Sequence, residues 1–114
     1  MNILGLIDKY VELSTRCTEL NKNKDISEEK EKELRSKFLE ASETLVKIEE
    51  LIPELSTLEI FRLIDVLNAK MNAIAQDADN RLIENSKREI YYYSLFDTQL
   101  REEVARRSEI KKTK

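Results

Sequence analysis

Apolar residues recur at alternating spacings of three and four along most of this chain, and this rhythm limits the fold more than any other feature. In the first segment it runs through Ile3, Leu6, Tyr10, Leu13, Cys17 and Leu20. A repeat of this kind places one apolar stripe along a helix, where it can face a neighbouring helix. The sequence therefore predicts a first helix over residues 3–22, buried more deeply where Leu4, Ile7 and Val11 widen the stripe.

A second helix is predicted after the polar segment 21–25, ending near Leu51. Either Asp25 or Ser27 can cap its first turn, because both side chains accept hydrogen bonds from free backbone N–H groups. Pro53 disfavours helical geometry at the residue before it and so ends the helix. We expect its core stripe to be Leu34, Phe38, Ala41, Leu45, Ile48 and Ile52.

The start of a third helix is marked by Ser56 and Glu59, which have the spacing of a capping box. Its expected stripe is Ile60, Ile64, Leu67, Met71, Ile74 or Ala75, Ala78 and Leu82. The stripe fails at residues 84–89, where Ser86 and Glu89 form a second box of the same spacing. It then resumes through Ile90, Tyr93, Phe96, Leu100 and Val104.

Two arrangements fit this last part of the chain. In the first, a tight turn at 84–87 gives an antiparallel four-helix bundle with short loops. In the second, one helix of about 50 residues runs unbroken from 57 to about 108, spanning about 75 Å. Such three-helix protomers would dimerise along the exposed half as a coiled-coil-like bundle. Both arrangements are all-α, as a single glycine, a single proline and 38% charged residues indicate.

The length of 114 residues predicts a single helical-bundle domain over 1–108, followed by a basic, flexible tail over 109–114. The lone Cys17 offers no partner for a disulfide within the chain, which favours a reducing cytoplasmic location. The opening segment is too short and too interrupted to span a bilayer, and it lacks the features of a signal peptide. We therefore expect no membrane association.

Several kinds of chemistry are disfavoured by the residues themselves. The chain has no histidine, the usual general base near neutral pH. Its helical stripes are almost purely apolar, so acidic side chains fall on outward positions rather than in a carboxylate site. Cys17 lies on such a stripe, where a buried thiol acts as a small apolar side chain. We therefore expect no enzyme activity, no metal, no cofactor and no small-molecule substrate.

Three consecutive tyrosines, Tyr91, Tyr92 and Tyr93, stand out in a chain with one other tyrosine and no tryptophan. At about 100° per residue, a helix that buries Tyr93 turns Tyr91 and Leu95 outward and leaves Tyr92 at the edge. Tyrosine is common at protein interfaces, because its ring buries area while its hydroxyl stays in water. The predicted partner-binding residues are Arg88, Tyr91, Tyr92, Leu95, Thr98 and Glu102.

These residues favour a non-enzymatic protein–protein interaction module, such as an adaptor, an inhibitor, an immunity-type protein or a chaperone. Its partner would be another protein or a second copy of the chain, with a homodimer as the first expectation. The alternative is a nucleic-acid-binding accessory protein, because residues 81–114 hold nine basic and six acidic side chains. The candidate anion-binding residues are Arg101, Arg106, Arg107, Lys111, Lys112 and Lys114.

Overall fold

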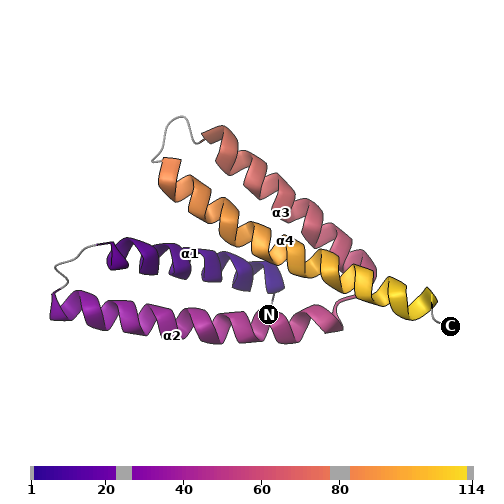
Figure 1. The fold of residues 1–114 in the computed structure, drawn as a ribbon, viewed down its shortest axis with the longest axis horizontal. Coiled ribbons are helices and arrows are strands. Elements are labelled where there is room, and N and C mark those ends of the chain that lie inside the picture. The colour runs from indigo at the N-terminus through magenta and orange to yellow at the C-terminus, as the bar shows by residue number, and fades with distance from the viewer. Residues whose placement is uncertain (1, 23–26, 78–82, 113–114) are drawn as a thin grey trace. The chain divides into compact units, whose positions relative to one another are not determined.

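The computed structural model describes residues 2–22, 27–77 and 83–112, and nearly all of them lie in helices (Figure 1). The elements are α1 (Ile3–Asn21), α2 (Glu28–Leu51), the short 3₁₀ helix η1 (Ile52–Glu54), α3 (Thr57–Asp77) and α4 (Ile83–Lys112). The described ranges contain no strand, so the predicted all-α class is confirmed. The packing contacts between helices are those of a helical bundle.

The chain divides into two compact units, residues 1–49 and 50–114. In the first unit α1 and α2 lie side by side and are joined by exposed ion pairs. Lys9 pairs with Glu40 at 3.1 Å, and Arg16 pairs with Glu33 at 3.1 Å. From Lys9 to Arg16 the residue number rises along α1, while that of the paired glutamate on α2 falls from 40 to 33. The two helices are therefore antiparallel.

The predicted stripe of α1 is largely confirmed. Asn2 caps the helix by accepting a hydrogen bond from the backbone N–H of Leu4 at 3.1 Å. The stripe positions Leu6, Leu13 and Leu20 are buried, as are Ile7 and Val11, which widen it. Ile3, Tyr10 and Cys17 are half-buried rather than buried.

The stripe predicted for α2 is wrong at Phe38, whose side chain is 66% exposed. The helix begins after Ser27, whose hydroxyl accepts the Lys30 N–H at 3.3 Å, and it ends before Pro53 as expected. The predicted Ala41 and Ile48 are buried, and Thr44, which was not part of the stripe, is buried with them. Thr44 tolerates burial because its hydroxyl donates to the Glu40 carbonyl at 2.8 Å.

The second unit starts with the predicted capping box. The Glu59 N–H donates to the Ser56 hydroxyl oxygen at 3.1 Å, and the Ser56 N–H donates to the Glu59 carboxylate at 3.0 Å. The hydrogen bond from Ser56 holds the pKa of Glu59 below its ordinary value, because it favours the charged form. Ile74 is half-buried and Ala75 exposed, so Ile74 continues the α3 stripe, while Ala78 and Leu82 lie outside the described residues.

The alternative of one long helix is wrong. α3 ends at Asp77 and α4 begins at Ile83, and the two helices lie side by side (Figure 1). Arg107 of α4 donates from Nη1 to the hydroxyl of Thr57, at the start of α3, over 3.1 Å. In a continuous helix these two residues would be about 75 Å apart. The contact therefore makes the α3–α4 pair antiparallel.

The predicted turn at 84–87 is also misplaced, because these residues lie inside α4. Ser86 is buried, and its hydroxyl oxygen has no hydrogen-bond partner among the described residues. It therefore caps no helix, and the second Ser-x-x-Glu pattern is a coincidence of spacing within a helix. The stripe beyond it is confirmed at Tyr93, Phe96 and Leu100, which are buried, while Ile90 and Val104 at its two ends are half-buried.

The core of the second unit brings this α4 stripe together with a matching one on α3. The buried α3 residues are Ile60, Leu63, Ile64 and Leu67. Full burial of one such side chain stabilises a fold by about 1.5–3 kcal/mol. α4 continues to Lys112, so residues 109–112 are helical, while the proposed division into a domain over 1–108 and a flexible tail stays a prediction.

Candidate functional site

The three consecutive tyrosines lie in three different surroundings on α4. Tyr93 is only 8% exposed and belongs to the core, whereas Tyr91 is 59% exposed. Tyr92 is half-buried, and its ring meets that of Tyr91 edge-on, with the two ring centres 5.6 Å apart. The predicted distribution of the three rings around the helix is thus confirmed.

The outer face of α4 is the surface formed by Arg88, Tyr91, Leu95, Thr98 and Glu102. These positions follow one another at spacings of three and four, so they lie along one side of the helix. Leu95 is 37% exposed, Thr98 and Glu102 are exposed, and Arg88 is half-buried. The structure therefore places the predicted partner-binding residues together, with Tyr92 at their edge.

The two charged residues of the outer face have no ion-pair partner among the described residues. One guanidinium nitrogen of Arg88, Nη1, is buried and meets no hydrogen-bond acceptor there. Five other charged residues of α4 are paired within the helix: Arg101 binds Asp97 at 3.0 Å, and Glu103 binds Arg106 and Arg107. Within the described part of the chain, the outer face thus carries a cation without an ionic partner at one end and an anion without one at the other.

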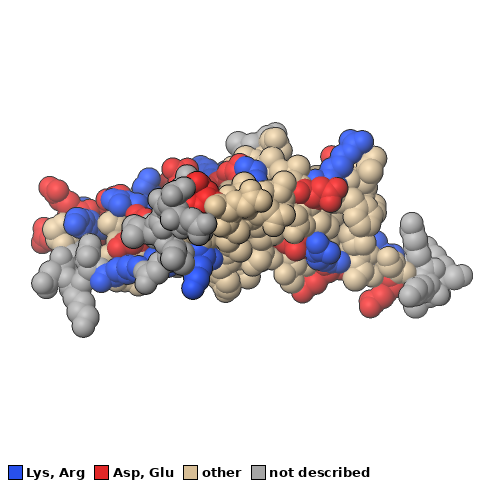
Figure 2. All heavy atoms as spheres, turned by 90° about the horizontal axis from the view of Figure 1, so that it is seen from above, with Lys and Arg blue, Asp and Glu red and all other residues tan. Residues whose placement is uncertain are grey.

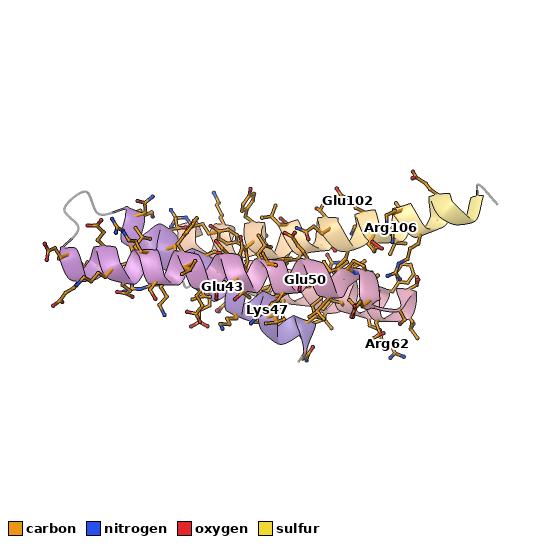
Figure 3. All side chains as sticks on the ribbon, turned by 90° about the horizontal axis from the view of Figure 1, so that it is seen from below. Glu43, Lys47, Glu50, Arg62, Glu102 and Arg106 are labelled. Carbon is orange, nitrogen blue, oxygen red and sulfur yellow. The ribbon has the colours of Figure 1, made fainter. Side chains whose placement is uncertain are left out.

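The basic residues predicted to bind anions are largely occupied by acidic neighbours. Arg106 hydrogen-bonds to Glu103, which lowers the pKa of Glu103 and raises that of Arg106. Glu102 and Arg106 both project from α4 in Figure 3. On the face seen in Figure 2, acidic and basic side chains are interspersed. These neighbours weaken the positive field that nucleic-acid binding by Arg101 and Arg106 would need.

Arg107 has a structural role that the sequence analysis missed. Its Nη2 donates to the Leu55 carbonyl at 2.7 Å and to the Pro53 carbonyl at 3.1 Å, in addition to the Thr57 contact. The side chain therefore ties α4 to the segment between η1 and α3. No local sequence signal predicts a contact across more than 50 residues. The side chains of Lys111 and Lys112, and all of Lys114, lie outside the described residues.

Further apolar side chains are exposed on two other helices. They are Phe38, Leu39 and Val46 on α2, and Leu58, Phe61 and Val66 on α3. Between α3 and α4 lies an open groove of about 450 Å³. It is lined by Phe61, Ile64, Asp65, Asn68, Arg101, Val104 and Ala105. The sequence analysis did not predict this groove, because its two walls come from distant parts of the chain.

The single cysteine, Cys17, lies on the apolar stripe of α1. Cys17 is half-buried, and burial raises the pKa of its thiol. A raised pKa lowers the thiolate fraction at neutral pH, and the thiolate is the reactive form. Its surroundings therefore favour a packing role over a nucleophilic one.

Comparison with protein-family models, with curated proteins and with solved structures finds no match to this chain. Within the described residues, no group of three or more acidic or cysteine side chains is placed to hold a metal ion. None of the helices, over the same residues, is both long enough and apolar enough to cross a membrane.

Proposed function

We propose that this protein is a non-enzymatic helical interaction module that binds a protein partner through the outer face of α4. The observation that carries the proposal is the exposure of Tyr91 and Leu95, one turn apart on a helix whose opposite side buries Tyr93, Phe96 and Leu100. When a partner covers water-exposed apolar side chains, their removal from water lowers the free energy of the complex. Tyrosine adds a hydroxyl that can remain hydrated at the edge of the contact.

The class of protein that fits this description includes adaptors, inhibitors, immunity-type proteins and chaperones that act by presenting a helix face. A cytoplasmic location belongs to the same proposal, because a single cysteine suits a reducing compartment. The candidate nucleic-acid function receives no comparable support, since Arg101, Arg106 and Arg107 are engaged within the protein.

The test is the double variant Tyr91→Glu/Leu95→Lys, which leaves the net charge unchanged. We expect helicity by circular dichroism to match the wild type, while association measured by light scattering is lost. A pull-down from native lysate, with and without nuclease, covers partners other than the chain itself. A protein that the wild type retains and the double variant loses, with or without nuclease, supports the proposal.

The matched control is Phe61→Glu/Val66→Lys on α3, because these side chains are 49% and 37% exposed and the charge change is the same. Association should survive in this control. If the control and the Tyr91/Leu95 variant lose association equally, the outer face of α4 is not the specific surface. If the Tyr91/Leu95 variant unfolds, or if nuclease removes all captured material, the proposal is wrong.

A further inference from the structure

The outer face of α4 is complementary to itself when it is turned end to end. We propose that its occupant is a second copy of this chain, lying antiparallel over α4 with the two-fold axis at Leu95. This inference rests on the proposed function and names its partner.

Arg88 and Glu102 lie at equal distances from Leu95. Each is seven residues away, or about 10.5 Å along the helix axis, in opposite directions. A two-fold axis through Leu95 therefore sets Arg88 of each copy beside Glu102 of the other. Tyr92 and Thr98, each three residues from Leu95, meet in the same way across the axis.

The charges of this face select the antiparallel orientation. In a parallel pair Arg88 would face Arg88 and Glu102 would face Glu102, and like charges in contact oppose association. In the antiparallel pair, two ion pairs form from residues that have no ionic partner among the described residues of one chain.

The apolar part of the face supplies the driving force. Leu95 meets its own copy at the axis, and the Tyr91 and Tyr92 rings extend the apolar contact on both sides. Burial of aromatic and aliphatic side chains stabilises such an interface, while exposed ion pairs at its ends mainly decide orientation and partner. A second copy provides this pattern of charge by the symmetry of the pair.

The test uses two charge-reversal variants. Each variant alone should dimerise poorly, and a mixture of the two should form a mixed dimer. Arg88→Glu places glutamates opposite each other at both ends of the dimer, and Glu102→Arg places arginines there. We expect each single variant to dimerise at least about tenfold more weakly than the wild type by sedimentation equilibrium. When the two are mixed, opposite charges meet again at both ends, and native mass spectrometry should show a mixed dimer.

Arg62→Glu is the matched control, because it makes the same charge change as Arg88→Glu at an exposed position on α3 (Figure 3). It should leave wild-type dimerisation unchanged. A second check is Arg88→Glu/Glu102→Arg in one chain, which should dimerise with itself and exclude the wild type. This double variant tests the pairing of the two charges even if one of the single variants folds poorly.

Two results would overturn the inference. The first is a wild-type protein that stays monomeric at the highest concentration at which it remains soluble. The second is a mixture of the two single variants that forms no mixed dimer although both are folded. Neither result decides the proposed function, which has its own test. The proposed function is supported if the wild type retains some other protein in the pull-down and Tyr91→Glu/Leu95→Lys does not, and it is contradicted if no such protein exists.

Discussion

The inner side of α4 and the outer side of α2 each carry a phenylalanine at a heptad position, and the two side chains lie in opposite surroundings. Phe96 is 1% exposed in the second unit, whereas Phe38 is 66% exposed in the first. Both are preceded and followed by apolar residues at helical spacing. Spacing alone therefore identifies a helix without deciding which side of it faces the core.

The difference arises because α2 carries two overlapping stripes. The expected stripe runs through Leu34, Phe38, Ala41, Leu45, Ile48 and Ile52. The buried one shares Ala41, Ile48 and Ile52 with it, but it passes through Thr44 and leaves out Phe38. The second stripe is less apolar in composition, yet Thr44 satisfies its hydroxyl within the helix. A short hydroxyl side chain can thus replace an aromatic one on a buried face, which leaves Phe38, Leu39 and Val46 in water.

The largest expected effect comes from removing the buried member of this pair. Phe96→Ala should lower the free energy of unfolding by about 3–5 kcal/mol, because it removes a fully buried ring and leaves a cavity. Urea denaturation followed by circular dichroism measures this change. The matched variant Phe38→Ala should shift the same quantity by no more than about 0.5 kcal/mol. Equal losses in the two variants would show that Phe38 is also part of a core.

The comparison can be sharpened with the neighbouring arginines of α4. Arg107→Lys should lower the free energy of unfolding by about 1–3 kcal/mol, because lysine cannot reproduce the forked contacts to the Pro53 and Leu55 carbonyls. Arg106→Lys, beside it, keeps an exposed pair to Glu103 and should cost less than about 1 kcal/mol. Chemical denaturation of both variants checks the prediction, and a larger loss in Arg106→Lys would contradict it.

A smaller effect separates the two Ser-x-x-Glu patterns. Ser56→Ala removes a helix cap and should cost about 1 kcal/mol of stability. Ser86→Ala removes a buried hydroxyl that has no partner among the described residues, so it should be neutral or stabilising. The difference between the two thermal midpoints measures this contrast. Similar destabilisation in both variants would mean that Ser86 has an interaction beyond those described.

The smallest expected effect concerns pH. The pKa of Glu59 is lowered in the folded state by its hydrogen bond with Ser56, so the folded protein favours the carboxylate. This contribution is fully present above the unfolded-state pKa of about 4.3 and is lost as pH falls through the lower folded value. The stability advantage of the wild type over Glu59→Gln should therefore shrink from pH 5 to about pH 3. An advantage that grows in acid would contradict the assignment, and carboxyl NMR titration locates the pKa directly.

Local patterns predicted most of the fold. The all-α class, the end of α2 before Pro53, the cap at Ser56 and the stripe from Tyr93 to Leu100 could all be inferred, because each depends on neighbours within two helical turns. The outer face of α4 was predicted for the same reason. Its role in binding is a proposal, and so is its partner.

What the patterns missed depends on residues far apart in the chain. Thr44 is buried and Phe38 is exposed, which the spacing within α2 alone does not decide, and the open groove has one wall from α3 and one from α4. The end of α3 carries no glycine to mark it, so the break was expected at 84–87 instead of before Ile83. Such choices arise from tertiary packing rather than from helix propensity.

The contacts of Arg107 have a consequence for folding kinetics. They join residues 50 to 54 positions apart, at the end of the helix pair farthest from the connection between Asp77 and Ile83. Contacts near that connection close the smallest loops and are expected to form first. The Arg107 contacts should then be absent from the transition state, so Arg107→Lys should accelerate unfolding and leave the folding rate nearly unchanged. The contacts of this side chain would thus lengthen the time that the second unit stays folded.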